Sequence, residues 1–214
     1  EFTDLGSGFK IAMRDLEIRG AGNLLGAQQH GHMEAVGYDL YCKMLNEAVK
    51  HLKGEMEEED YTTTIDLNID AYIPDTYISN EYQKLDIYKR IAAIESEEEM
   101  EDMVEELIDR FGDIPKKVEM LLTVAQLKAL AHKVYVTAVE QKGDTYTFAM
   151  YERAKVCPEK IPALLKEFRD DLAFKAEPPM FIYRKKRINK RDKTGSALEV
   201  VKNVLIGIKG LLGS

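Results

Sequence analysis

Cysteine is scarce in this chain, and the patterns that make it useful for metals or redox chemistry are missing. The 214 residues contain two cysteines, Cys42 and Cys157, which lie 115 positions apart and outside any C-x-x-C pair. This spacing predicts neither a zinc motif nor a redox motif. Two distant thiols favour a reducing compartment, so we expect a cytoplasmic protein.

Long apolar runs are missing too, although hydrophobic residues make up 45% of the chain. No segment approaches the roughly 18 residues of a membrane span, so we expect no membrane contact. The apolar content is enough for a core, which excludes a wholly disordered chain. The chain begins with Glu1-Phe2-Thr3-Asp4 and has neither an initiator methionine nor a signal peptide, so we interpret it as a fragment of a longer protein.

Motifs for nucleotide binding and for catalysis are absent or incomplete. Neither G-x-x-x-x-G-K-[ST] nor G-x-S-x-G occurs. Residues 20–26, GAGNLLG, have the glycines of a dinucleotide fingerprint but lack the apolar strand before them, which favours an ordinary glycine loop. His30 and His32 would make only an incomplete metal site, since a catalytic zinc needs three protein ligands, so we interpret them as surface or contact residues. We therefore expect no cofactor, no metal and no enzymatic activity from this chain alone.

The residue pattern predicts two units with a boundary near the acidic stretch EMEEEDY. Residues 1–54 combine helical segments with a glycine-rich loop, and residues 55–214 read as an α+β domain. In the second unit the pattern predicts a strand in 62–74, helices over 80–94, 97–111 and 115–132, a hairpin around 142–144, a helix from about 158 to Asp170, two strands around Pro178-Pro179 and a last helix capped by Ser196 and Glu199.

Charge is unevenly distributed, with 30 basic and 38 acidic residues and a net charge of −8. Six acids crowd the predicted helix 97–111: Glu98, Glu101, Asp102, Glu105, Glu106 and Asp109. The ordinary explanation is a solvated face, and the functional one is a docking face for a basic partner. The basic run 184–193, RKKRINKRDK, offers an alternative function as a nucleic-acid-binding domain, against which the net acidity argues.

Three stretches carry a resemblance to a known family. They are GSGFKIAMRDLEIRGAGNLLGAQQHGHMEAVGYDLYCKML at 6–45, YQKLDIYKRIAAI at 82–94 and ELIDRFGDIP at 106–115. Together they resemble the C-terminal part of bacterial transcription-repair coupling factors. These are ATP-dependent translocases on double-stranded DNA that displace stalled RNA polymerase and recruit nucleotide-excision repair.

The resemblance implies roles for residues in both units. Residues 1–54 would be the translocation motif, a truncated helical hairpin with a glycine-rich loop and a connector helix. This motif couples ATP hydrolysis to movement on DNA, so ATP and magnesium belong to the parent protein. The coupling residues implied by the match are Arg14, Arg19, Gly20, Gly22 and Gln29.

The second unit, residues 55–214, would be a regulatory domain without catalysis. The resemblance implies that it docks on the N-terminal domain of the same protein. There it masks the surface that recruits the excision-repair damage-recognition protein. Glu106 and Asp109 fall where the family makes this contact. The implied function is therefore autoinhibition of repair recruitment.

Overall fold

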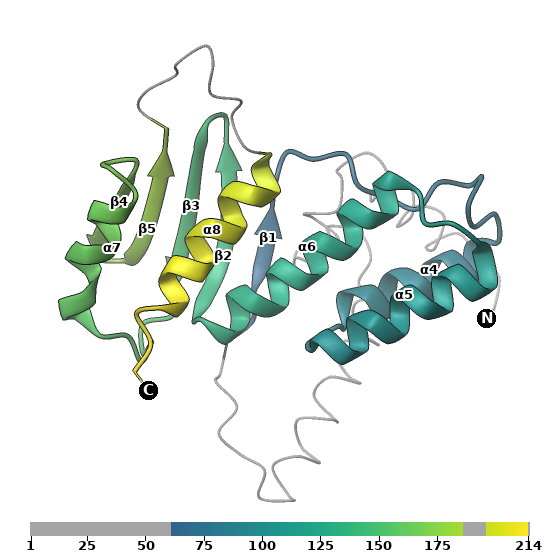
Figure 1. Cartoon of the computed structure of the whole chain (residues 1–214), viewed down its shortest axis with the longest axis horizontal. Helices are drawn as coiled ribbons and strands as arrows, with labels where there is room; N and C mark the ends of the chain where they lie inside the picture. Colours follow the sequence, from purple (N-terminus) through teal and green to yellow (C-terminus); the bar gives the residue numbers. More distant parts are fainter. Residues whose placement is uncertain (1–60, 186–195, 214) are drawn as a thin grey trace, which may run out of the picture.

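Helices cover one face of a mixed sheet in the computed structural model, which describes residues 61–185 and 196–213 (Figure 1). In chain order the elements are β1 (Thr64–Asp66), α4 (Glu81–Ala92), α5 (Glu97–Phe111), α6 (Lys116–Lys133), β2 (Val136–Lys142), β3 (Thr145–Met150), the short 3-10 helix η1 (Pro158–Lys160), α7 (Ile161–Glu167), β4 (Leu172–Ala176), β5 (Pro179–Arg184) and α8 (Ala197–Lys209). The expected α+β class is confirmed.

The sheet has the strand order β1-β2-β3-β5-β4, with β1 parallel to β2 and the other neighbours antiparallel. Its centre is the hairpin of β2 and β3, which the sequence predicted. Lys142 pairs with Thr145 across a loop of Gly143 and Asp144. Gly143 has φ +59°, a conformation that costs glycine nothing because it lacks a Cβ. The hairpin is therefore closed by residues suited to a tight turn.

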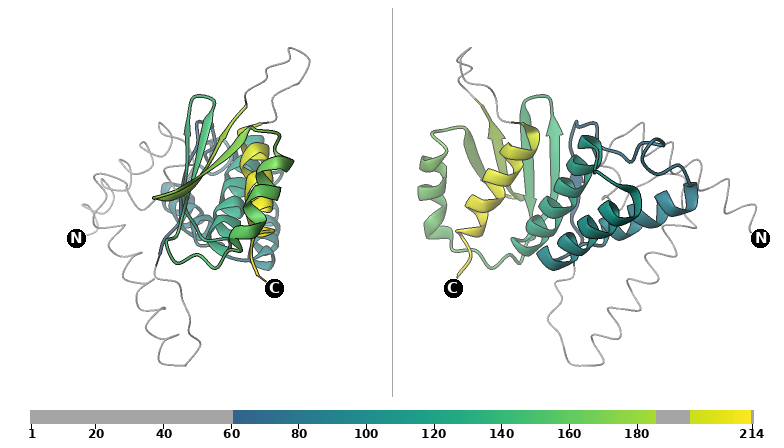
Figure 2. Two further views of the ribbon diagram at one scale, coloured as in Figure 1. Left: turned by 90° about the vertical axis from the view of Figure 1, so that its left-hand side faces the viewer. Right: turned by 45° about the vertical axis from the view of Figure 1, so that its right-hand side comes forward.

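The core lies between the sheet and the helices. Helices α6 and α8 cross in front of the sheet, α7 lies by β4 and β5, and a side view shows these helices on one side (Figure 2). Buried residues alternate along β3 at Tyr146, Phe148 and Met150, as expected for a strand with one covered face. Helices α4 and α5 form a hairpin beside α6, away from β4 and β5 (Figure 1). This hairpin therefore forms one end of the domain.

Helices α4, α5 and α8 each begin at a capping side chain. Ser96 and Ser196 each accept a hydrogen bond from the backbone N–H of a glutamate three residues on, at 3.1 and 3.3 Å, and both complete a capping box. Asn80 accepts from Gln83 N at 3.0 Å. The predicted starts of α5 and α8 are confirmed, and α4 begins one residue later than predicted, at Glu81.

The long strand predicted in residues 62–74 is wrong in extent. Only Thr64–Asp66 forms a ladder, because β1 is an edge strand that pairs with three residues of β2. Beyond it Ile69 N bonds Leu67 O in a turn at 2.9 Å, and Ile73 N–H donates to the buried Tyr88 hydroxyl at 2.8 Å. The apolar alternation reflects burial against the helices rather than sheet pairing.

Other helix ends also differ from the predicted ranges. Helix α4 ends at Ala92 rather than 94, and Pro115 is the cap before α6 rather than part of its first turn. The helix expected to end near Asp170 is a 3-10 turn followed by α7, which stops at Glu167. Arg169 and Asp170 have φ values of +51° and +71°, which a right-handed helix cannot contain.

None of the helices in the two described ranges combines the length and the apolar composition needed to cross a bilayer. The predicted boundary near residue 55, with residues 1–54 before it, lies outside the described residues and stays a prediction.

Candidate functional site: the acidic face of helix α5

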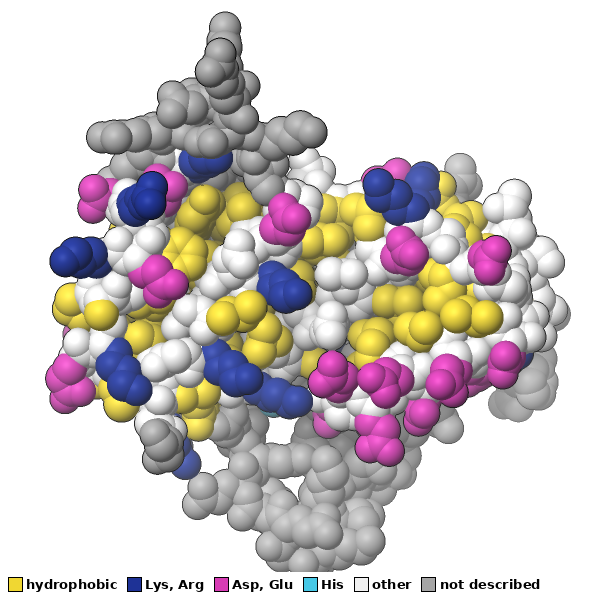
Figure 3. All heavy atoms as spheres, viewed as in Figure 1, with side chains coloured by type: hydrophobic (Ala, Val, Ile, Leu, Met, Phe, Trp, Pro, Cys, Tyr) yellow, Lys and Arg dark blue, Asp and Glu magenta, His cyan; other side chains and the backbone are white. Residues whose placement is uncertain are grey.

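Helix α5 separates apolar and acidic side chains onto opposite faces. Met100, Met103 and Leu107 point into the core. We define the acidic stripe as the exposed carboxylates Glu98, Glu101, Asp102, Glu105 and Asp109. At 3.6 residues per turn these positions fall on one side of the helix, opposite the buried residues. Figure 3 shows a row of acidic side chains along this edge of the domain.

The negative charges of the acidic stripe are not neutralised by contacts within the described part of the chain. Within the described residues no hydrogen bond or ion pair engages any of its five carboxylates. Ile108, whose side chain is among the most exposed large apolar ones at 48%, lies on the same helix beside Glu105 and Asp109. Like charges spaced three or four residues apart repel each other. The surface therefore favours a cationic partner that also offers an apolar contact.

Glu106 differs from the stripe because it is paired within the domain. Arg90 of α4 donates from Nη1 to Glu106 Oε1 at 2.7 Å and from Nη2 to Oε2, and Arg110 Nη1 donates to Oε1. These hydrogen bonds, first from Arg90 and then from Arg110, lower the pKa of Glu106 to about 2. The structure therefore separates the two predicted docking acids: Asp109 belongs to the exposed stripe, whereas Glu106 is held at its flank.

The two arginines that hold Glu106 were not among the predicted site residues. Arg110 follows Glu106 by four residues, a spacing that favours a helical ion pair and could have indicated the contact. Arg90 is 16 residues away on another helix, so only the packing of α4 against α5 brings the two together.

The Glu106 contacts predict a pH-dependent part of the stability. The pKa of Glu106 is lower in the folded domain than its usual 4.5, so its contribution is full above pH 4.5 and is lost as the pH falls towards 2. Glu106→Gln should lower the free energy of unfolding at pH 6 by about 0.5–1 kcal/mol, the scale of exposed ion pairs. Urea titrations at pH 6 and pH 2.5 should show this deficit shrinking at the lower pH. Glu105→Gln is the matched control, and an equal Glu106→Gln deficit at both pH values would contradict the interpretation.

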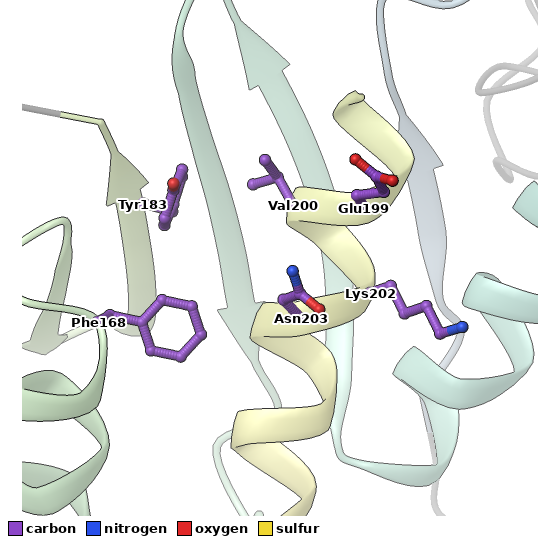
Figure 4. A pocket seen from close by; sticks show the side chains of 6 residues that line it. All are labelled: Phe168, Tyr183, Glu199, Val200, Lys202 and Asn203. Carbon is purple, nitrogen blue, oxygen red and sulfur yellow. The ribbon is translucent and has the colours of Figure 1, made fainter. Parts of the chain in front are cut away.

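A second surface feature is a shallow hollow of about 380 Å³ between α8 and the α7–β5 side of the sheet. Figure 4 shows the Phe168 and Tyr183 rings on one side and Val200 and Asn203 of α8 on the other, with Lys202 extending away from the rings. Burial, followed by the nearby charge of Asp171, raises the pKa of the Tyr183 hydroxyl. Glu199 completes the lining, and within the described residues no hydrogen bond joins two of these side chains.

The remaining candidate residues fall mainly outside the described ranges. Arg14, Arg19, Gly20, Gly22 and Gln29 are not described, nor are His30 and His32. Of the basic run only Arg184 and Lys185 are described, at the end of β5 and just after it. Within residues 61–185 and 196–213, no three His, Cys, Asp or Glu side chains are grouped so that they could hold a metal ion.

Comparison with known proteins identifies relatives along the whole chain. Residues 67–161 match the model of the TRCF domain. The chain is 44% identical over 214 residues to a transcription-repair-coupling factor of Bacillus subtilis, covering 99% of this chain and 18% of that protein. It is 51% identical over 156 residues to the one of Staphylococcus haemolyticus, covering 72% and 13% respectively.

A solved structure of the C-terminal domain of a transcription-repair coupling factor is 28% identical to this chain, with a TM-score of 0.49. The aligned region covers 68% of this chain and 88% of the chain in that structure. The chain spans less than a fifth of the length of the two full-length relatives named above. The shared sequence is extensive and includes the TRCF domain itself. The chain is thus similar to transcription-repair coupling factors along its length, and its match to the TRCF domain lies at residues 67–161.

Proposed function

We propose that the α+β domain is a regulatory module that docks, through the acidic stripe, on a basic surface in the N-terminal part of its parent protein. The observation that carries this proposal is the row of five exposed carboxylates opposite the buried face of α5. The similarity to coupling factors supports it, because Glu106 and Asp109, the docking pair that the resemblance implies, both lie on this helix.

Electrostatics gives a physical reason for such docking. Gathering like charges on one helix costs free energy, and a basic partner removes this repulsion when it binds. Complementary charge also raises the association rate and selects against other partners. Ile108, at 48% exposure, adds an apolar contact beside the charges. The stripe therefore provides both specificity and a modest, reversible affinity.

Reversibility is what an autoinhibitory contact requires. When docked, the domain would mask the surface that recruits the excision-repair damage-recognition protein. Binding of DNA or RNA polymerase elsewhere in the parent protein would shift the population towards the undocked state. A coupling free energy of roughly 1–3 kcal/mol is typical of such regulation.

The test is a calorimetric titration of this chain with the N-terminal repair-recruiting region of the same protein. We expect association at about 0.1 M salt that weakens strongly at about 1 M, where the screening length falls from roughly 10 Å to roughly 3 Å. Absence of association at both salt concentrations would reject the docking proposal. Direct DNA binding through the basic run 184–193 would then be measured.

We also propose that residues 1–54 are the motif that couples ATP hydrolysis to translocation on double-stranded DNA. The 44% identity with the Bacillus subtilis protein extends over this segment and supports the assignment. ATP and magnesium would be bound elsewhere in the parent protein. Arg19, with Arg14, Gly20, Gly22 and Gln29, would transmit the nucleotide state to DNA.

Arg19→Ala in the full-length protein should abolish most displacement of stalled RNA polymerase while ATP hydrolysis continues. The reason is that the substitution removes a coupling residue and leaves the ATP site unchanged. Displacement and ATPase assays on the same preparation measure the two activities. Lys10→Ala, which lies in the same unit outside the implied coupling residues, is the control. Wild-type displacement by Arg19→Ala would contradict the proposed role.

A further inference from the structure

The acid at the flank of the stripe already has cationic partners within the domain. Both oxygens of Glu106 accept hydrogen bonds from arginine: Oε1 from Arg90 and Arg110, and Oε2 from Arg90. The Arg90 contact is a two-bond fork between guanidinium and carboxylate, the geometry that an arginine on a docking partner would also use. A cation that approaches Glu106 from outside therefore meets an occupied carboxylate.

These internal contacts are accessible and exchangeable. The side chains of Arg90 and Arg110 are 43% and 39% exposed, and that of Glu106 is 27% exposed. Asp86, one helical turn before Arg90, places Oδ2 3.8 Å from Arg90 Nη1. Arg90 therefore has a second carboxylate on its own helix when the contact with Glu106 opens. The arrangement has two alternative pairings that differ by the movement of one exposed side chain.

We infer that Arg90, assisted by Arg110, competes with the docking partner for Glu106, so that docking replaces an ion pair within the domain by one between domains. This inference rests on the proposed docking function. In the undocked domain Arg90 holds Glu106, and the five carboxylates of the acidic stripe stay exposed. In the docked state a cation of the partner takes Glu106 and Arg90 turns to Asp86. Arg90 thereby weakens docking and keeps it reversible.

A purely structural role of the same contact predicts the opposite result. If Arg90 served only to hold α4 against α5, weakening its fork would loosen α5 and weaken docking. If Arg90 competes, weakening the fork strengthens docking. Arg90→Lys separates the two because lysine keeps the charge but cannot form the planar two-bond contact.

The experiment measures the affinity of four chains for the N-terminal repair-recruiting region of the same protein. They are wild type, Arg90→Lys, Glu106→Gln and the double variant. We expect Arg90→Lys to bind about twofold to fivefold more tightly than wild type, within the range of exposed ion pairs. The gain should vanish when Glu106→Gln is also present, because the competition acts through that carboxylate. Arg153→Lys, an exposed arginine in a turn after β3, is the control for the exchange itself.

A second measurement follows Arg90 directly. The Nε–Hε resonance of Arg90 in nuclear magnetic resonance spectra should shift on docking, while that of Arg153 should not. Association of wild type without a gain in Arg90→Lys, or with a gain that persists beside Glu106→Gln, would overturn this inference alone. Absence of association in wild type and Arg90→Lys would overturn the docking function and the inference together.

Discussion

Neutralising four carboxylates of the acidic stripe should weaken docking by about tenfold to hundredfold and remove most of its salt dependence. The variant carries Glu101→Gln, Asp102→Asn, Glu105→Gln and Asp109→Asn. Each exposed contact contributes about 0.2–1 kcal/mol, and each 1.4 kcal/mol is a factor of about ten in affinity. Stability should not fall, because within the described residues these side chains make no hydrogen bond or ion pair, and their mutual repulsion is removed.

The measurement is the titration with the N-terminal region at low and high salt. A second variant serves as a control by neutralising four exposed acids away from α5: Glu152, Glu159, Glu167 and Glu177. It changes the net charge by the same amount and should keep nearly wild-type affinity. Equal loss in both variants would mean that overall charge, rather than the α5 surface, determines the association.

Replacing Phe148 by alanine should destabilise the domain by about 3–5 kcal/mol, as other buried phenylalanines do. Phe148 is fully buried in β3, and its register neighbours are Val139 on one side and Phe181 on the other. The substitution removes an aromatic ring from the layer between the sheet and the helices. Domains are typically stable by about 5–15 kcal/mol, so the loss is a large part of the total.

Urea unfolding followed by circular dichroism measures the effect. Thr147→Ala is the matched control, because Thr147 is the adjacent half-buried residue and points to the other face of β3. Its substitution should cost less than about 1 kcal/mol. A similar cost for the two variants would contradict the assignment of the covered face.

Local signals in the sequence predicted the elements whose ends are determined by neighbouring residues. The capping boxes of Ser96 and Ser196 determine where α5 and α8 begin. Each box consists of hydrogen bonds between residues only three positions apart. The hairpin followed from β-branched and aromatic residues around Gly143. In each case the determining interaction lies within a few residues of the predicted boundary.

Features that depend on distant residues were not predictable in the same way. The alternation in residues 62–74 predicted a long strand, but the ladder ends at Asp66, where pairing with β2 stops. The burial that causes the alternation comes from other elements, such as Tyr88 of α4, which accepts the Ile73 N–H. An apolar period shows which residues are buried and does not show which partner buries them.

In the candidate site, too, the features set by neighbouring residues were predictable and those set by distant residues were not. The crowding of acids on α5 is visible in the sequence, since the helix and its period were predicted correctly. The pairing of Glu106 within the domain is not visible in the sequence, because its partner Arg90 lies on another helix. Asp109 and Glu106 looked equivalent from their spacing, and tertiary packing distinguishes them.

The parallel pairing of β1 determines the order in which the sheet can assemble. Thr64 pairs with Ala138, 74 positions later, whereas β2 and β3 meet across two residues. Closing a long loop costs more chain entropy, and contacts between distant residues slow folding. The helices α4, α5 and α6 lie between these two strands in the chain. We therefore expect the sheet to form outward from the β2–β3 hairpin. Strand β1 should join the sheet last during folding and detach first during unfolding.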